Sequence, residues 1–91
     1  MTTIKRIVLD VLKPHRPDGL EFSTAVATRS PGCRIVLTVA AVDELTESVV
    51  LVIEGADLQY DGIATAISDL GGSVHSIDEV EVECERSESN Q

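Results

Sequence analysis

The alternation of apolar and polar positions predicts a first strand over residues 4–12. Ile7, Leu9 and Val11 occur at every second position, so their side chains share one face of an extended chain. Residues 13–19 then contain two prolines and a glycine, which end a strand and favour a loop. Asp18 is placed to cap a helix over residues 20–29, whose apolar side chains recur at helical spacing.

Two almost continuous apolar runs occupy the middle of the chain. Residues 33–42 and 49–53 are rich in Val, Ile and Leu, and the polar turn Asp43–Glu47 separates them. Two such runs joined by a short polar turn predict a β-hairpin. Asp57 is a candidate cap for a second helix over residues 59–70, and Gly71-Gly72 supplies the left-handed residue that commonly ends a helix.

The last strand is predicted over residues 74–85. Its end alternates between apolar and acidic residues, a pattern typical of an edge strand that must resist unwanted pairing. The apolar parity slips by one position between Ile77 and Val80, which predicts a bulge at Asp78-Glu79. We therefore expect a single domain over residues 1–85 and a polar, disordered tail over residues 86–91.

The element order βαββαβ predicts an α+β ferredoxin-like sandwich. Its antiparallel four-stranded sheet has the strand order 4-1-3-2, and both helices lie on one face. Strand one is then central and antiparallel to the last strand. This pairing places Lys5 and Arg6 opposite Glu81 and Glu83, and brings the end of strand one towards residues 75–78.

The middle strands are apolar at nearly every position, although two helices can cover only one face of the sheet. Continuous apolar strands are usually covered on both faces. The other face would present Val8, Leu12, Val36 and Val50 as an exposed apolar patch, which soluble monomers rarely tolerate. The pattern predicts a homo-oligomer.

The composition indicates which cellular environment and which partners to expect. Sixteen acidic against seven basic residues give a net charge of −9, which repels nucleic acid, and aromatic residues make up only 2% of the chain. The acidic, lysine-poor composition fits a halophilic cytosol. There is no apolar run long enough for a membrane span and no signal-peptide pattern, so a cytoplasmic location is expected. Cys33 and Cys84 lack metal-ligand spacing and are expected to be reduced thiols.

Two sets of polar residues are candidate sites. Near one end of the sheet, carboxylates and imidazoles suited to a ligand or to proton transfer are Asp10, His15, His75, Asp78 and Glu79. Oxygen ligands for Ca²⁺ or Mg²⁺ could come from Asp10, Asp43, Glu44, Glu47 and Asp78. The alternatives are that Asp10 accepts hydrogen bonds from the loop at residues 13–16 or pairs with a cation across a subunit boundary, and that the hairpin carboxylates form a solvated turn.

Several stretches resemble the archaeal domain-of-unknown-function family 211. They are Leu9–His15, Val42–Glu47, Ile53–Gly55 and above all Gly71–Val80, with the resemblance running from about residue 4 to residue 80. The resemblance implies a ferredoxin-like fold, an archaeal cytosolic origin and closed homo-oligomeric rings, but no activity. Ala41 stands where an acidic residue is expected, so an acidic site that includes this position is in doubt.

Two functions remain open from the sequence. One is a non-enzymatic, ring-forming binding or regulatory domain that holds a divalent cation or small ligand between subunits. The other is a small-molecule enzyme that uses His15 or His75 with Asp10 or Asp78 as an acid–base pair. No catalytic residue can be assigned from the sequence.

Overall fold

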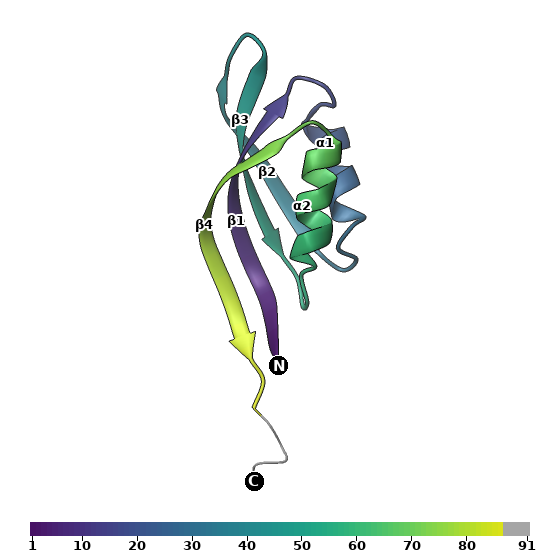
Figure 1. Ribbon diagram of the computed structural model, residues 1–91, viewed down its shortest axis with the longest axis vertical. Coiled ribbons are helices and arrows are strands. Elements are labelled where there is room, and N and C mark those ends of the chain that lie inside the picture. Colours follow the sequence, from purple (N-terminus) through teal and green to yellow (C-terminus); the bar gives the residue numbers. More distant parts are fainter. Residues whose placement is uncertain (87–91) are drawn as a thin grey trace.

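A computed structural model describes residues 1–86, and residues 87–91 lie outside the described part. Six elements follow in the order βαββαβ (Figure 1): β1 Thr2–Pro14, α1 Gly19–Ala27, β2 Arg34–Val42, β3 Thr46–Glu54, α2 Tyr60–Asp69 and β4 Ser73–Cys84. All six predicted elements are present. The predicted tail at residues 86–91 falls, apart from Arg86, outside the described residues.

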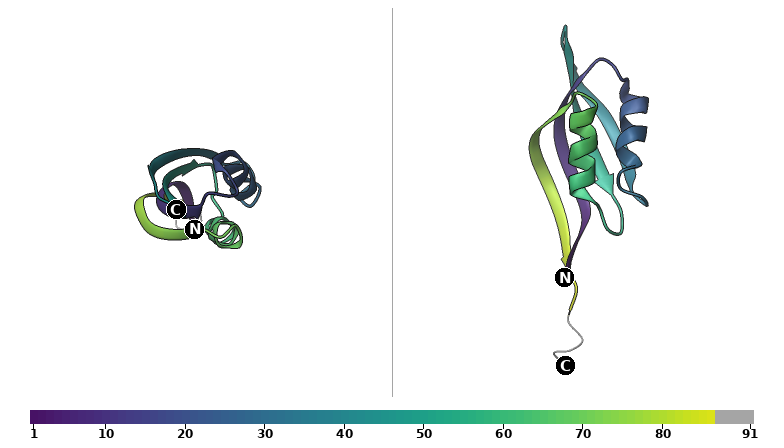
Figure 2. Two further views of the ribbon diagram at one scale, coloured as in Figure 1. Left: turned by 90° about the horizontal axis from the view of Figure 1, so that it is seen from above. Right: turned by 45° about the vertical axis from the view of Figure 1, so that its right-hand side comes forward.

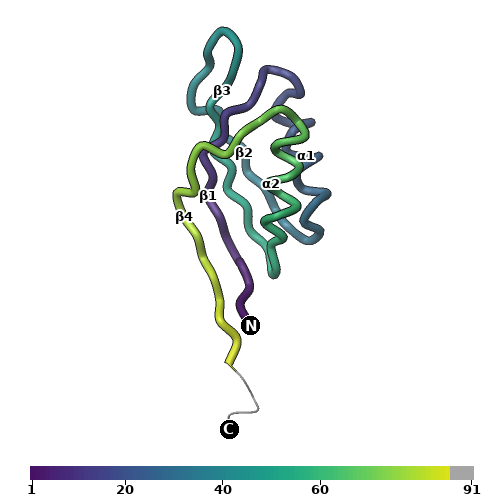
Figure 3. The backbone as a smooth tube through the Cα atoms, in the orientation of Figure 1, coloured from purple at the N-terminus to yellow at the C-terminus, as the bar shows by residue number. Residues whose placement is uncertain are grey.

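The strands form one antiparallel sheet in the order β2-β3-β1-β4, which is the predicted order read from the opposite edge. Both helices lie on one face, and no element covers the other face within residues 1–86 (Figure 2). The backbone trace shows β1 and β4 running side by side along most of their length (Figure 3). The α+β ferredoxin-like prediction is confirmed.

The core lies between the sheet and the helices. The inward positions of β1 and β3 alternate with half-buried positions, as a strand with one covered face requires. The helices complete the core on the covered face, with Phe22 and Val26 from α1 and Ile63 and Ile67 from α2. We call the uncovered face of the sheet the open face.

The pairing of β1 with β4 follows the predicted register. Arg6 lies opposite Glu81, and the Nζ atom of Lys5 lies 3.7 Å from a carboxylate oxygen of Glu83. The register shifts between Glu79 and Ile77, so that Asp78 is the extra residue, as the slipped parity predicted. Two further irregularities occur in this pair, and in one of them His75 is the extra residue.

The helix ends confirm one predicted cap and correct another. The Asp18 carboxylate accepts a 2.9 Å hydrogen bond from the Glu21 amide and caps α1. Asp57 does not cap α2, which begins after Gln59 without a side-chain cap bond. The Gln59 amide instead donates to the Ser30 hydroxyl at 3.0 Å, so a side chain from the turn after α1 accepts a hydrogen bond at the start of α2. Gly71 has φ +85° and ends α2.

The hairpin turn is shorter than predicted, because Thr46 and Glu47 already belong to β3. Similarly, β1 continues through Lys13 and Pro14, two residues beyond the predicted end. Pro14 lacks an amide proton, but the ladder with β4 ends at Leu12, so Pro14 pairs with β3 alone and lies at an edge of the sheet, where proline is tolerated. These extensions bring Lys13 opposite Glu47 in the β1–β3 ladder.

Candidate functional site

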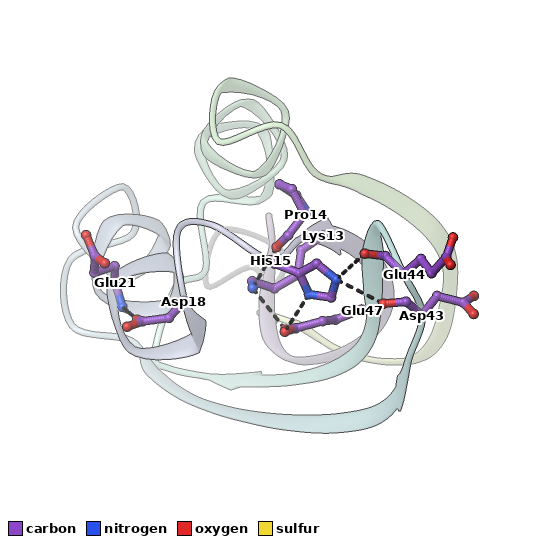
Figure 4. A network of polar contacts seen from close by, with 8 residues as sticks. All are labelled: Lys13, Pro14, His15, Asp18, Glu21, Asp43, Glu44 and Glu47. Atoms are coloured by element: carbon purple, nitrogen blue, oxygen red, sulfur yellow. Dashed lines mark hydrogen bonds and ion pairs between the residues drawn. The ribbon is translucent and has the colours of Figure 1, made fainter.

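A polar network joins the end of β1 to the β2–β3 hairpin (Figure 4). The alternation of β1 turns Lys13 to the covered face, in line with Val11, and its side chain is fully buried. Its ammonium group donates to Glu47 Oε1 at 3.0 Å and to the Pro14 carbonyl at 2.8 Å, and lies 5.8 Å from the ring centroid of Phe22. A buried ammonium group is stable only with such partners.

His15 occupies the other side of Glu47. Its Nδ1 atom lies 3.2 Å from Glu47 Oε2, and its Nε2 atom lies 2.9 Å from the carbonyl oxygens of both Asp43 and Glu44. All these partners accept hydrogen bonds, so both ring nitrogens are required to donate, which only the protonated imidazolium does. The bond to Glu47, followed by that to Glu44, accordingly raises the pKa of His15.

Glu47 is shared by two cationic neighbours. Hydrogen bonds from His15 and then Lys13 lower the pKa of its carboxyl group. The carboxylates of Asp43 and Glu44 point away from the imidazole, and only their carbonyl groups face it (Figure 4). The three hairpin carboxylates therefore do not converge in one chain, and this network fastens the hairpin to β1.

A second polar group lies on the open face. Asp10, Leu12, Ser48 and His75 line a hollow of about 270 Å³. Asp10 is half-buried in the middle of β1, and its carboxylate has no hydrogen bond or ion pair within residues 1–86. It does not accept hydrogen bonds from the loop at residues 13–16, so that interpretation of Asp10 is excluded for this part of the chain.

The predicted ligand residues separate into three places. Asp10 and His75 share the open-face hollow, whereas His15 lies with Glu47. The carboxylate of Asp78 accepts a 2.8 Å hydrogen bond from Ser76, and Glu79 pairs with Arg6. Over residues 1–86, no three His, Cys, Asp or Glu side chains gather as a metal site would require. The end of strand one does reach residues 75–78, but through Asp10 and not through His15.

A charged row crosses one end of the open face. Arg6 binds Glu54 at 2.8 Å and also pairs with Glu79, while Arg34 lies 3.4 Å from the second oxygen of Glu54. The hydrogen bond to Glu79, followed by that to Glu54, raises the pKa of Arg6. This row contrasts with Asp10, whose carboxylate has no such cation beside it in the described chain.

Sequence reasoning missed the contact between Lys13 and Glu47. The signal was available, because Lys13 continues the inward parity of Ile7, Leu9 and Val11. Glu47 likewise precedes Val49 by two positions on the covered side of β3. Two opposite charges at inward positions of adjacent strands predict a buried pair once the strands are extended to include them.

A single chain offers one carboxylate and one imidazole at the open-face hollow. Asp10 and His75 are donor types that suit a divalent cation, but a stable site needs more ligands than these two. Ser48 adds a hydroxyl group. A cation here would therefore need ligands from another copy of the chain or from water.

Comparisons with known proteins agree with the predicted resemblance. Residues 5–87 match the profile of family DUF211, described as an uncharacterized ArCR. A curated relative, the uncharacterized protein MJ0319 of Methanocaldococcus jannaschii, is 44% identical over 80 residues, which cover 88% of this chain and 82% of the relative. None of the helices in residues 1–86 is long and apolar enough to cross a membrane. The chain belongs to the archaeal domain-of-unknown-function family 211.

Proposed function

We propose that this protein is a non-enzymatic binding or regulatory domain that assembles into a closed homo-oligomeric ring and holds a divalent cation or small ligand between subunits. The observation that carries the proposal is the Asp10 carboxylate, half-buried on the open face without a partner in residues 1–86. A carboxylate among apolar side chains is costly unless it is paired or coordinated. The Asp10 oxygens reach solvent in the single chain, and assembly or a ligand would replace the water there.

The distribution of apolar surface supports self-association. Leu12 and Val36 on the open face are 41% and 47% exposed, and no helix covers them in the described chain. Further apolar side chains are exposed along both edge strands, including Val39 and Val80 at 47% and 53%. Exposed apolar side chains therefore occur on the open face and at both edges of the sheet, and such surfaces often mark protein–protein contacts. The acidic composition supports a salt-rich cytoplasm as the setting.

Native mass spectrometry on protein purified from high salt, before and after treatment with a chelator, tests this proposal. We expect a single closed subunit number, with a discrete mass that is lost on chelation and restored by Ca²⁺ or Mg²⁺. A closed oligomer that carries no extra mass and gains none from added cations would restrict the proposal to organic ligands. A protein that is monomeric at micromolar concentration would refute it.

A second candidate function rests on Asp10 and His75 lining the same hollow. A carboxylate beside an imidazole is the arrangement of a general acid–base pair, which would act on a small molecule. Titration of the His75 ring protons by NMR, in wild type and in Asp10→Asn, distinguishes the two functions. An acid–base pair requires the His75 midpoint to move when Asp10 is neutralised, and identical midpoints would exclude it.

A further inference from the structure

The two edges of the sheet carry matching apolar patterns. On the covered face of the edge strand β2, Val39 is 47% exposed, and on β4 Ile77 and Val80 are 49% and 53% exposed. The residues beside them on β1 and β3 are fully or almost fully buried. Each edge therefore ends a row of apolar side chains with members that remain about half exposed, although α1 lies against β2 and α2 against β4.

These rows can be followed across all strands from the pairing register. One runs Ile35, Ile53, Ile7, Val80, the next runs Leu37, Leu51, Leu9, Ile77, and the third runs Val39, Val49, Val11, Val74. On β4 these side chains are three residues apart, because Asp78 and His75 are extra residues, whereas on β2 they are two residues apart. A strand with the apolar spacing of β2 therefore extends all three rows at the β4 edge when it pairs across the same two bulges. Main-chain donors and acceptors on the outer side of an edge strand are a ready template for such pairing.

On the open face, one row of charged side chains alternates in sign from the β2 edge to the β4 edge. In register order, Arg34, Glu54, Arg6 and Glu81 form a row of alternating positive and negative side chains. Glu81 at the β4 edge has no ion pair among residues 1–86, and Arg34 at the β2 edge is 78% exposed. Placing the β2 edge of a second copy beside β4 continues the alternation, because its Arg34 then faces Glu81.

Strand direction permits the same arrangement. All pairs in the sheet are antiparallel, so β2 and β1 run one way and β3 and β4 run the other. A second copy in the same orientation brings its β2 antiparallel to β4, and the alternation of directions continues without a break. We propose that β2 of one copy adds to β4 of the next in this register, an inference that rests on the self-association proposed above.

Pairing of like edges fits less well. Two β4 strands would bring the acidic side chains Glu79, Glu81 and Glu83 of both copies together, which like-charge repulsion disfavours. A β2-to-β4 contact uses two different surfaces, so each copy retains one free edge for a further neighbour. Such heterologous contacts close into rings or extend into filaments.

This contact also bears on the open-face hollow. In register order, Thr38, Val50, Asp10 and Ser76 form one row. With Arg34 of the neighbour facing Glu81, its Thr38 reaches Ser76, next to His75, when Asp78 is an extra residue on this edge of β4 as well. The hollow lined by Asp10, Ser48 and His75 spans β3, β1 and β4, with His75 on the edge strand. The edge contact therefore brings β2 of the next copy to the His75 border of the candidate ligand site.

Charge exchange tests the register. Arg34→Glu and Glu81→Arg should each raise the dissociation constant between copies about tenfold at moderate salt, and the double exchange should recover most of this loss. Arg29→Glu combined with Asp69→Arg, which alters an ion pair of 3.9 Å on the helical side, is the matched control and should leave assembly unchanged. Single exchanges without effect on assembly would overturn the proposed edge contact.

A disulfide trap separates this inference from self-association itself. In a Cys33→Ser, Cys84→Ser background, oxidation of Thr38→Cys with Ser76→Cys should give a ladder of covalent multimers, because opposed residues of antiparallel strands lie about 4.5–5.5 Å apart. Within one chain these positions stand on opposite edges, about 14 Å apart, too far for a bond.

The displaced pair Thr38→Cys with Glu83→Cys is the control and should give no ladder. An oligomer in native mass spectrometry that forms no ladder from the aligned pair would overturn the edge contact and leave self-association standing. Covalent dimers from Thr38→Cys alone would point to β2 pairing with β2 and would also overturn it. A monomer in both experiments would refute the two proposals together.

Discussion

The ammonium group of Lys13 lies 3.0 Å from Glu47 Oε1, and the Lys13 side chain is fully buried between the sheet and Phe22. An ion pair therefore joins the adjacent strands β1 and β3 inside the domain, close to the end of β1. The two residues are 34 positions apart in the sequence, so this pair links the first strand to the hairpin.

Lys13→Met should destabilise the domain by about 1–3 kcal/mol, because the side chain keeps its volume but loses its hydrogen bonds. Glu47→Gln should cost more, since it leaves the buried ammonium group without a counter-charge. Urea unfolding of both variants measures the order. Arg29→Met, which breaks an exposed ion pair of 3.9 Å with Asp69, is the control and should change stability by less than about 0.5 kcal/mol. An equal or smaller loss for Glu47→Gln would contradict the role of Glu47 as the necessary partner.

The stability of the hairpin attachment should depend on pH in a defined window. The pKa of His15 is raised above its ordinary value of 6.5, so its contribution is complete below that value and is lost as pH rises through the raised pKa. The pKa of Glu47 is lowered from 4.5, so its contribution is present above that value and is lost as pH falls through the lowered pKa. The network is therefore strongest between about 4.5 and 6.5.

Urea unfolding from pH 4 to 9 at constant salt measures this dependence. His15→Gln should remove the decline on the alkaline side, whereas His75→Gln, which alters a histidine on the open face, should retain it. The hairpin amides of residues 43–46 should also lose protection from hydrogen exchange, relative to their intrinsic exchange rates, above the raised pKa. If the free energy of unfolding of His15→Gln still declines with rising pH as in wild type, another group is responsible for the decline.

Sequence periodicity was sufficient for the sheet because the inward positions in the middle of β1 and β3 are branched aliphatic residues at every second position, from Ile7 to Val11 and from Val49 to Ile53. The extra residue Asp78 was also visible as a parity slip. The candidate site was harder to predict from the sequence. His15 and His75 have the same chemistry, and only the observed strand lengths show that they lie in different places. Ending β1 at residue 12 instead of Pro14 concealed that Lys13 and Glu47 are paired.

Gly62 in α2 is a position where a methyl group should not fit. A Cβ atom there would lie 2.7 Å from the carbonyl oxygen of Arg29, which is backbone and cannot rotate away. Gly62→Ala should therefore destabilise the domain although alanine favours a helix by about 1 kcal/mol over glycine. Overpacking of this kind typically costs about 1–3 kcal/mol. Thr65→Ala, an exposed position of α2, is the control and should be neutral or slightly stabilising; a stabilised Gly62→Ala would mean that the two helices move apart freely.

Asp10→Val should stabilise the isolated fold while abolishing its response to cations. The carboxylate is half-buried without a partner in residues 1–86, and valine suits a strand better, so we expect a gain of about 1 kcal/mol in chelator. A ligand that binds only the folded state adds to the free energy of unfolding, so Ca²⁺ or Mg²⁺ should stabilise wild type but not the variant. Asp43→Ala, whose carboxylate points away from the protein, is the matched control and should keep the response. A cation response that survives in Asp10→Val would move the site elsewhere, and a destabilised variant would show that the carboxylate serves the fold itself.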